Sequence, residues 1–258
     1  MKHSILLKSL LAVAILTTSY LPDAYAAFSF GTNSSGVQDV TMNASDVGQS
    51  FMANWLCSAN TTCGTSGTTP KTLSATGIFT LDSYTSSGIT LSATIKNTTS
   101  SSVQAALMSI GISAPGLTPS WGTAGSVFTQ IGIADGKNGN FSGGFKNINA
   151  CIYSENGCNG GTIADGLGDG YTGGTMNPLS TDSFKFILAS NSASIGSSVT
   201  LSDFAVKFQT NLSPTGSYEF GDGLGPSPTP EPGSFWLLGS ALLAMIGFSL
   251  RKTMPKKA

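Results

Sequence analysis

The dominant pattern along the chain is a two-residue alternation of apolar residues with Ser and Thr. The clearest case is residues 89–95, where Ile, Leu, Ala and Ile alternate with Thr and Ser. Successive side chains of a strand point to opposite faces, so this pattern predicts a half-buried β-strand. We expect further strands at residues 37–42, 50–55, 73–81, 103–112, 127–133, 145–153, 184–188 and 199–209.

The segment 199–209 changes the phase of its alternation at Ser202 and Asp203. This change predicts a β-bulge or a strand edge at that point. A helix is the alternative for residues 104–112, although no segment before the C-terminal region combines a helical period with convincing caps. About nine strands joined by short polar turns predict an all-β fold. The expected form is an antiparallel β-sandwich, and a jelly roll is one arrangement of it that fits the pattern. This ectodomain is expected at residues 27–220.

The N-terminal residues 1–26 have the features of a secretory signal peptide. Lys2 and Lys8 supply positive charge, residues 10–16 form a short apolar stretch, and Ala24 and Ala26 stand before Ala27 as small residues of a cleavage site. The apolar stretch is too short for a comfortable membrane span. We therefore expect cleavage before Ala27 and an exported mature protein.

Three consecutive segments are expected after the ectodomain. Residues 221–233, rich in Pro and Gly, predict an extended stalk that includes Pro230, Glu231 and Pro232. Residues 234–250 carry no charge and would span roughly 26 Å as a helix, enough for one transmembrane segment. The tail 251–258 contains the cations Arg251, Lys252, Lys256 and Lys257, which favour a cytoplasmic end. The predicted intermediate lies in the inner membrane with its N-terminal side out and its C-terminus in.

The order of Pro230-Glu231-Pro232, an apolar helix and the Arg251-Lys252 cluster resembles the PEP-CTERM sorting signal of Gram-negative bacteria. The resemblance covers about the last tenth of the chain. It implies recognition by exosortase, a transpeptidase-like integral membrane enzyme, and release or transfer of the protein to the cell surface or exopolysaccharide matrix. A weaker likeness to β-rich ectodomains of such proteins implies no function. An ordinary single-span anchor behind a proline-rich linker is the alternative.

Charge narrows the classes of function. Six lysines and twelve acidic residues lie between Ala27 and Pro232, a net charge of −6, so nucleic acid is not an expected partner. The only histidine is His3, in the predicted signal peptide, which leaves the mature chain without a Ser–His–Asp triad or a histidine metal site. We expect a protein without cofactor that is not an enzyme. A hydrolase using two carboxylates stays open, with candidates at Asp135, Glu155, Asp165, Asp169 and Asp182.

Four cysteines in an exported chain indicate disulfides. They allow three connectivities, of which the local pairs Cys57–Cys63 and Cys151–Cys158 are favoured. Zinc is disfavoured, since five and six intervening residues miss the usual ligand spacing.

Two binding hypotheses remain for the ectodomain. Asp165 and Asp169 lie in a Gly-rich stretch and are weak calcium candidates, although Asp-Gly also marks an ordinary turn. Aromatic residues that could form a sugar platform, or equally lie in the core, are Trp55, Trp121, Tyr84, Tyr153 and Tyr171. The expected function is therefore an exported structural or exopolysaccharide-associated protein. The alternative is a carbohydrate-binding or adhesive module held permanently on the membrane.

Overall fold

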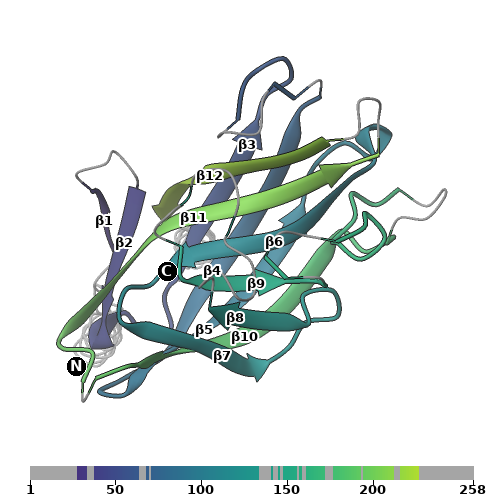
Figure 1. Cartoon of the computed structure of the whole chain (residues 1–258). Coiled ribbons are helices and arrows are strands. Elements are labelled where there is room, and N and C mark those ends of the chain that lie inside the picture. The colour runs from purple at the N-terminus through teal and green to yellow at the C-terminus, as the bar shows by residue number, and fades with distance from the viewer. Residues whose placement is uncertain are drawn as a thin grey trace, which may run out of the picture.

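The computed structural model of the chain is all-β and its strands form two packed antiparallel sheets (Figure 1). It describes residues 28–33, 38–63, 68–69, 71–133, 141, 145, 148–155, 157–158, 161–171, 177–192, 194–211 and 216–226. The strands are β1 (Ser29–Thr32), β2 (Gln38–Asn43), β3 (Ser50–Cys57), β4 (Leu73–Thr85), β5 (Gly88–Asn97), β6 (Ala105–Ser113), β7 (Leu117–Thr123), β8 (Gln130–Ile133), β9 (Ala150–Tyr153), β10 (Thr181–Ser190), β11 (Ser198–Thr210) and β12 (Gly216–Pro226). Two 3-10 turns, η1 (Ala44–Asp46) and η2 (Ser101–Val103), accompany them.

The two sheets, here named A and B, share strand β12. Sheet B has the order β7-β10-β5-β4-β3, and sheet A continues with β11-β6-β9-β8, while β1 and β2 join sheet A along the start of β11. Residues 216–221 of β12 pair with β11, and residues 222–226 pair with β3. The strand therefore passes from one sheet to the other at Gly221.

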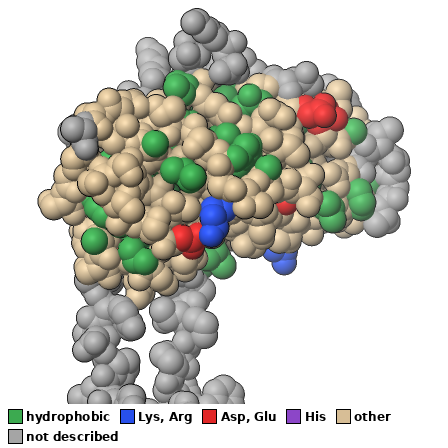
Figure 2. Space-filling model, turned by 90° about the horizontal axis from the view of Figure 1, so that it is seen from below, with side chains coloured by type: hydrophobic (Ala, Val, Ile, Leu, Met, Phe, Trp, Pro, Cys, Tyr) green, Lys and Arg blue, Asp and Glu red, His purple; other side chains and the backbone are tan. Residues whose placement is uncertain are grey.

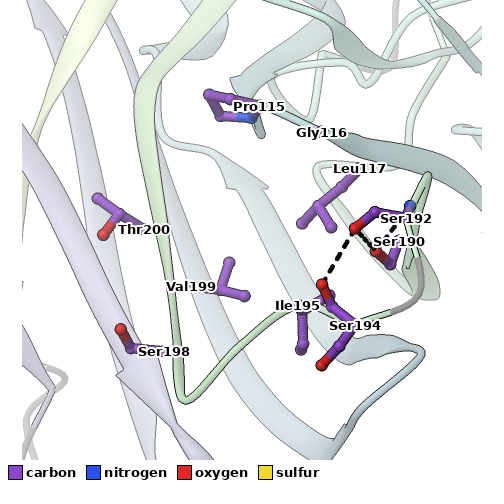
Figure 3. A pocket seen from close by; sticks show the side chains of 10 residues that line it. All are labelled: Pro115, Gly116, Leu117, Ser190, Ser192, Ser194, Ile195, Ser198, Val199 and Thr200. Atoms are coloured by element: carbon purple, nitrogen blue, oxygen red, sulfur yellow. Dashed lines mark hydrogen bonds between the residues drawn. The ribbon is translucent and has the colours of Figure 1, made fainter.

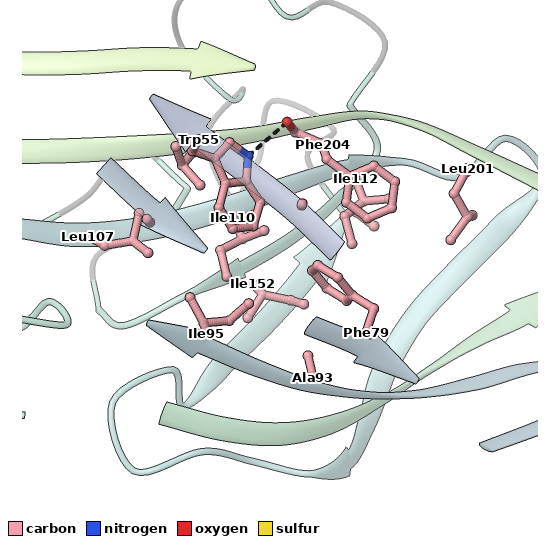
Figure 4. Packing of buried hydrophobic residues seen from close by; sticks show 14 of the residues in the cluster. Trp55, Phe79, Ala93, Ile95, Leu107, Ile110, Ile112, Ile152, Leu201 and Phe204 are labelled. Atoms are coloured by element: carbon pink, nitrogen blue, oxygen red, sulfur yellow. Dashed lines mark hydrogen bonds between the residues drawn. The ribbon is translucent and has the colours of Figure 1, made fainter. Parts of the chain in front are cut away.

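The core lies between the sheets and follows the alternation of the sequence. Phe51, Phe79 and Phe204 are fully buried, and their ring centroids lie 5.2 to 5.6 Å apart. The indole of Trp55 lies beside them and donates a hydrogen bond to the backbone carbonyl of Phe204 (Figure 4). Aromatic pairs at such distances add to the stabilisation from burial.

The outer face of sheet A is also covered. Phe141, Ile148 and the disulfide Cys151–Cys158 form a second apolar cluster with Ala205 of β11. All nine residues of β6 are buried, because this strand has apolar contacts on both faces. Lys207 and Phe208 pair with Ser109 and Leu107 of β6, so that Met108 is an extra, bulged residue.

Most of the predicted strands are present, and the predicted antiparallel β-sandwich is confirmed. The bulge or edge expected at Ser202 and Asp203 is present: Asp203 has φ 50°, and the register of β11 with β6 shifts between Ser202 and Ala205. The helix alternative for 104–112 is wrong, since β6 occupies it. β1, β7 and β12 were not predicted, and the jelly-roll form stays a prediction.

The start of the predicted stalk is corrected by the structure. Residues 221–226 belong to β12 and pair with neighbouring strands, so the domain reaches Pro226 instead of residue 220. Among the described residues, no helix is long and apolar enough to cross a membrane. The predicted transmembrane helix 234–250 and the basic tail 251–258 lie outside the described residues, as does the signal peptide 1–26.

Candidate functional site

The two ends of the described domain meet at one residue of β3. The ring of Phe28 packs edge-on against Phe51 with centroids 5.3 Å apart, and Pro226 is the strand partner of Phe51. Phe28 follows the predicted cleavage residues Ala24, Ala26 and Ala27, which lie outside the described part. The predicted signal-peptide junction and the C-terminal tail therefore leave the same end of the sandwich.

The sorting residues follow the last described strand closely. Pro230, Glu231 and Pro232 lie outside the described residues, as do the cations Arg251, Lys252, Lys256 and Lys257. Only residues 227–229 separate the end of β12 from Pro230. A chain advances at most about 3.6 Å per residue, so the Cα atom of Pro230 lies within about 14 Å of that of Pro226.

Both disulfides of the structure are local. Cys57 at the end of β3 is bonded to Cys63, and Cys151 of β9 is bonded to Cys158. These are the two pairs favoured from the sequence. The second disulfide belongs to the cluster that covers sheet A, where Ser109 of β6 donates a hydrogen bond to the carbonyl oxygen of Cys158 over 3.0 Å.

The calcium candidates Asp165 and Asp169 each bind protein groups. Oδ2 of Asp165 accepts hydrogen bonds from the backbone N–H and the hydroxyl of Thr162. Asp169 is buried and accepts the backbone N–H groups of Ala105 and Tyr171. In the described part of the chain, no three His, Cys, Asp or Glu residues are grouped as metal ligands would be. Both aspartates thus use their side-chain oxygens to stabilise the local backbone, as aspartates commonly do in turns.

Asp182 of β10 is the most extensively hydrogen-bonded carboxylate of the candidates. It is buried, and its oxygens accept the backbone N–H groups of Ser126, Val127, Phe128 and Ser183 at 2.8 to 3.0 Å. A Cβ atom on Gly125 would lie within 3 Å of this carboxylate. The group therefore fixes the loop before β8. Glu155 is exposed, and Asp135 lies outside the described residues.

Two further carboxylates have structural contacts that the sequence did not indicate. Glu219 of β12 and Lys207 of β11 are strand partners whose side chains are 6% and 8% exposed, and Oε1 of Glu219 lies 3.1 Å from Nζ of Lys207. Asp46 is buried at η1, where Oδ2 accepts the backbone N–H of Asn43 at 2.8 Å. Alternation along a strand shows which residues share a face, but it does not show whether the polar face is buried under other parts of the chain. Periodicity alone could therefore not locate the buried Lys207–Glu219 pair.

The aromatic candidates do not form one platform. Trp55 is 1% exposed and belongs to the core, which excludes it from a surface role. Trp121 of β7 is partly buried, and its indole N–H donates to the carbonyl of Thr129. The hydroxyl of Tyr84 donates to the carbonyl of Gly196, and burial raises the pKa of Tyr84. Tyr153 packs against the cluster of Phe141, Ile148 and the Cys151–Cys158 disulfide, whereas Tyr171 packs against Ala106 and Met108 of β6.

One pocket of about 350 Å³ opens where the turn before β7 meets the loop between β10 and β11 (Figure 3). Apolar side chains of Leu117, Ile195 and Val199 form part of its wall. Ser190, Ser192 and Ser194 bring hydroxyl groups to the side of Leu117 and Ile195 (Figure 3), and Ser198 and Thr200 of β11 complete the lining, with the Thr200 hydroxyl bonded to that of Thr41. None of the lining residues carries a charge, so the pocket suits a small neutral ligand with several hydroxyl groups.

The outer face of sheet B is polar and nearly uncharged. Seen from below the view of Figure 1, the molecule shows few charged side chains among scattered hydrophobic ones (Figure 2). Hydroxyls of neighbouring strands pair across this sheet, as between Ser50 and Thr80 at 2.7 Å and between Thr94 and Ser183 at 3.0 Å. Asp82 and Lys185 form an ion pair at 2.8 Å on it.

Comparison with known proteins identifies the C-terminal segment. Residues 228–252 match the family model of the PEP-CTERM protein-sorting motif. The match contains Pro230, Glu231 and Pro232 and extends to Lys252. No curated protein and no solved structure matches the chain. The chain is thus an exported protein that carries, behind its all-β domain, a PEP-CTERM sorting signal of the kind that exosortase processes.

Proposed function

We propose that the chain delivers a non-enzymatic β-sandwich to the cell surface or extracellular matrix, where it has a structural or exopolysaccharide-associated role. The observation that carries this proposal is the sorting motif at 228–252, which begins directly after the last strand of the domain. Exosortase would process the tail near Glu231 while residues 234–250 hold the protein in the inner membrane. In this proposal the tail is a sorting signal that is removed, and the β-sandwich is the part that acts outside the cell.

The contacts of the candidate carboxylates support a non-enzymatic role. Asp169 and Asp182, which the sequence offered as acid–base candidates, use their oxygens to bind backbone N–H groups. General acid–base chemistry needs a carboxyl group within reach of a substrate proton. These two groups are buried and directed at the protein instead.

Processing and localisation test the proposal together. The cells should express the full chain, the Glu231→Ala variant and a variant that lacks residues 234–250. Mass spectrometry of the mature C-terminus should show a shortened wild-type chain in the surface or matrix fraction. Glu231→Ala should accumulate unprocessed in the membrane. Wild-type processing and localisation of both variants would contradict the proposal.

A second candidate function is binding of a neutral glycan by a permanently anchored domain, and the pocket in Figure 3 favours it. Its uncharged hydroxyls and apolar wall match the two kinds of surface that a sugar presents. Affinity electrophoresis through gels containing a neutral polysaccharide such as dextran would detect binding. Ser192→Tyr should fill the pocket and remove the retardation, whereas Thr94→Tyr on the open face of sheet B should preserve it. Equal mobility with and without polysaccharide would reject this candidate.

A further inference from the structure

The two halves of β12 are held by very different contacts. In residues 216–221, Tyr218 and Phe220 are buried, and the ring of Phe220 stacks on Phe208 of β11 with centroids 5.6 Å apart. Glu219 adds the buried ion pair with Lys207. This half lies at the edge of sheet A beside β11, but its large side chains are buried, so we expect it to open only with the whole domain.

The half at residues 222–226 has far less to hold it. Its ladder runs along β3 on one side. At its other edge the backbone N–H of Leu224 donates to the side-chain oxygen of Gln38. Gly223 and Gly225 contribute no side chain, and Leu224 is only partly buried. A Gly-rich strand with few apolar contacts belongs to the least stable part of a fold.

Gly221 marks the boundary between these halves. It is the last residue of β12 that pairs with β11, and Asp222 is the first that pairs with β3. The nearest atoms to a Cβ built on Gly221 belong to the ring of Phe145 at 3.7 Å. A glycine at the point where the strand changes sheet gives the backbone freedom to swing there.

The boundary at Gly221 matters because it sets how much chain separates the anchored part of β12 from the sorting motif. With residues 222–226 docked on β3, Pro230 can lie no more than about 14 Å from the last strand residue. With that half released, the last anchored residue is Gly221, and the unanchored chain up to Pro230 lengthens from four residues to nine, or from about 14 Å to about 32 Å when extended. A cleft that takes the residues before the motif as an extended chain would use backbone groups of 222–226, and their hydrogen bonds to β3 must break first.

We propose that residues 222–226 are a release strand, whose undocking from β3 about Gly221 admits the processing enzyme to the PEP motif. The docked strand leaves only four residues between its end and Pro230 and so slows processing. The undocked strand supplies the extended backbone that the enzyme binds. This inference rests on the proposed function, because it concerns how the same tail is processed.

A disulfide staple between β12 and β3 tests the proposal. Gly223 and Asn54 are strand partners with exposed positions, and a Cβ atom on Gly223 meets nothing closer than the Asn54 carbonyl oxygen at 3.9 Å. Opposed residues of antiparallel strands have Cα atoms about 4.5–5.5 Å apart, within the range a disulfide spans. The full-length Asn54→Cys/Gly223→Cys protein should therefore cross-link after folding. The matched control is Asn54→Ser/Gly223→Ser, which cannot.

Pulse-chase labelling would follow the loss of the unprocessed chain in both variants. We expect the cross-linked protein to be processed at least about tenfold more slowly than the serine control, because access scales with the population of the open state. Dithiothreitol added during the chase, or a flexible ten-residue Gly/Ser insertion after Pro226, should restore processing of the stapled variant. Equal rates for the cross-linked protein and its control would overturn the release strand. A serine control and a wild-type chain that are never processed would overturn the proposed function itself.

A loosening variant gives an independent test. Leu224→Ser removes the apolar side chain of Leu224, which packs against the core. It should speed processing relative to wild type while the thermal midpoint of the domain stays unchanged. A processing rate that does not rise would contradict the proposal.

Discussion

The indole N–H of Trp55 on β3 donates a hydrogen bond to the backbone carbonyl oxygen of Phe204 on β11 over 3.1 Å (Figure 4). The bond crosses the interior from sheet B to sheet A. It is made at the bulge of β11, where Asp203 has φ 50° and the pairing with β6 is interrupted. The bulge leaves a carbonyl to be satisfied inside the core, and the indole supplies the donor.

Trp55→Phe tests this contact, because it keeps an aromatic ring and removes the donor. We expect the free energy of unfolding to fall by about 1–3 kcal/mol, since a buried carbonyl loses its partner. Urea denaturation followed by circular dichroism would measure it. The control is Leu56→Ala on the same strand, where the side chain is 63% exposed and the change should stay within about 0.5 kcal/mol. Equal losses in the two variants would contradict this role of the hydrogen bond.

Gly77→Ala addresses the space that the same indole occupies. A Cβ atom on Gly77 of β4 would lie 2.8 Å from Cη2 of Trp55 and 2.9 Å from Cε2 of Phe79. Both rings are fully buried, so overpacking should cost about 1–3 kcal/mol in thermal or urea unfolding. Gly225→Ala is the matched control, because no atom lies within 4 Å of its Cβ position.

A double-mutant cycle at Trp55 and Gly77 tests whether the two positions share the same space. In the double variant Trp55→Phe/Gly77→Ala the smaller ring frees the space that alanine needs. The loss of unfolding free energy in the double variant should therefore be smaller than the sum of the losses in the two single variants. Strict additivity would show that Gly77 is not needed for the fit of the indole.

The alternation of side chains was sufficient to predict the strands that face the core on one side. β5 and β10 follow it directly, with buried residues at every second position in most of their length. The phase change at Ser202 and Asp203 also carried correct information, because a bulge shifts the inward-facing set by one residue. Local pairing of the cysteines followed from their short spacing.

Other features depended on contacts that a local pattern does not contain. Residues 222–226 resemble a flexible stalk in composition, yet they pair with β3, a strand that lies far earlier in the sequence. The apolar residues Val127 and Phe128 suggested that β8 begins at 127, but the carboxylate of Asp182 accepts their N–H groups and holds them in a loop. Distant partners decided both cases.

Asp182→Asn tests that loop anchor. Asparagine keeps one acceptor oxygen and turns an NH₂ group toward backbone N–H donors that the carboxylate accepted. Loss of charged hydrogen bonds at a buried site should lower the free energy of unfolding by about 1.5–3 kcal/mol. Asp165→Asn is the control, since that carboxylate is partly exposed and binds Thr162 alone among the contacts described above. A smaller loss for Asp182→Asn than for the control, measured by urea denaturation, would reject the anchor.

The ion pair on sheet B predicts how stability depends on pH. Burial of Asp82 opposes its ionisation, but hydrogen bonds from Lys185 and Ser92 and the charge of Lys185 outweigh this effect and lower the pKa of Asp82. A carboxyl group whose pKa is lower in the folded state stabilises the fold above its unfolded pKa, near 3.9. That contribution is lost as the pH falls through the folded pKa.

Lys185→Met should therefore cost stability at neutral pH and cost less in acid. The side chains of Lys185 and Asp82 are 44% and 26% exposed, so solvent limits the loss at pH 7 to about 1 kcal/mol or less. As the pH falls below about 4 and through the lowered pKa of Asp82, this carboxyl becomes protonated in both proteins and their urea midpoints should converge. Lys96→Met, on the neighbouring strand β5, is the control and should show a difference from wild type that changes less with pH. A constant gap between wild type and Lys185→Met from pH 7 to pH 3 would mean that the methylene chain of Lys185, rather than its charge, supports this face of the sheet.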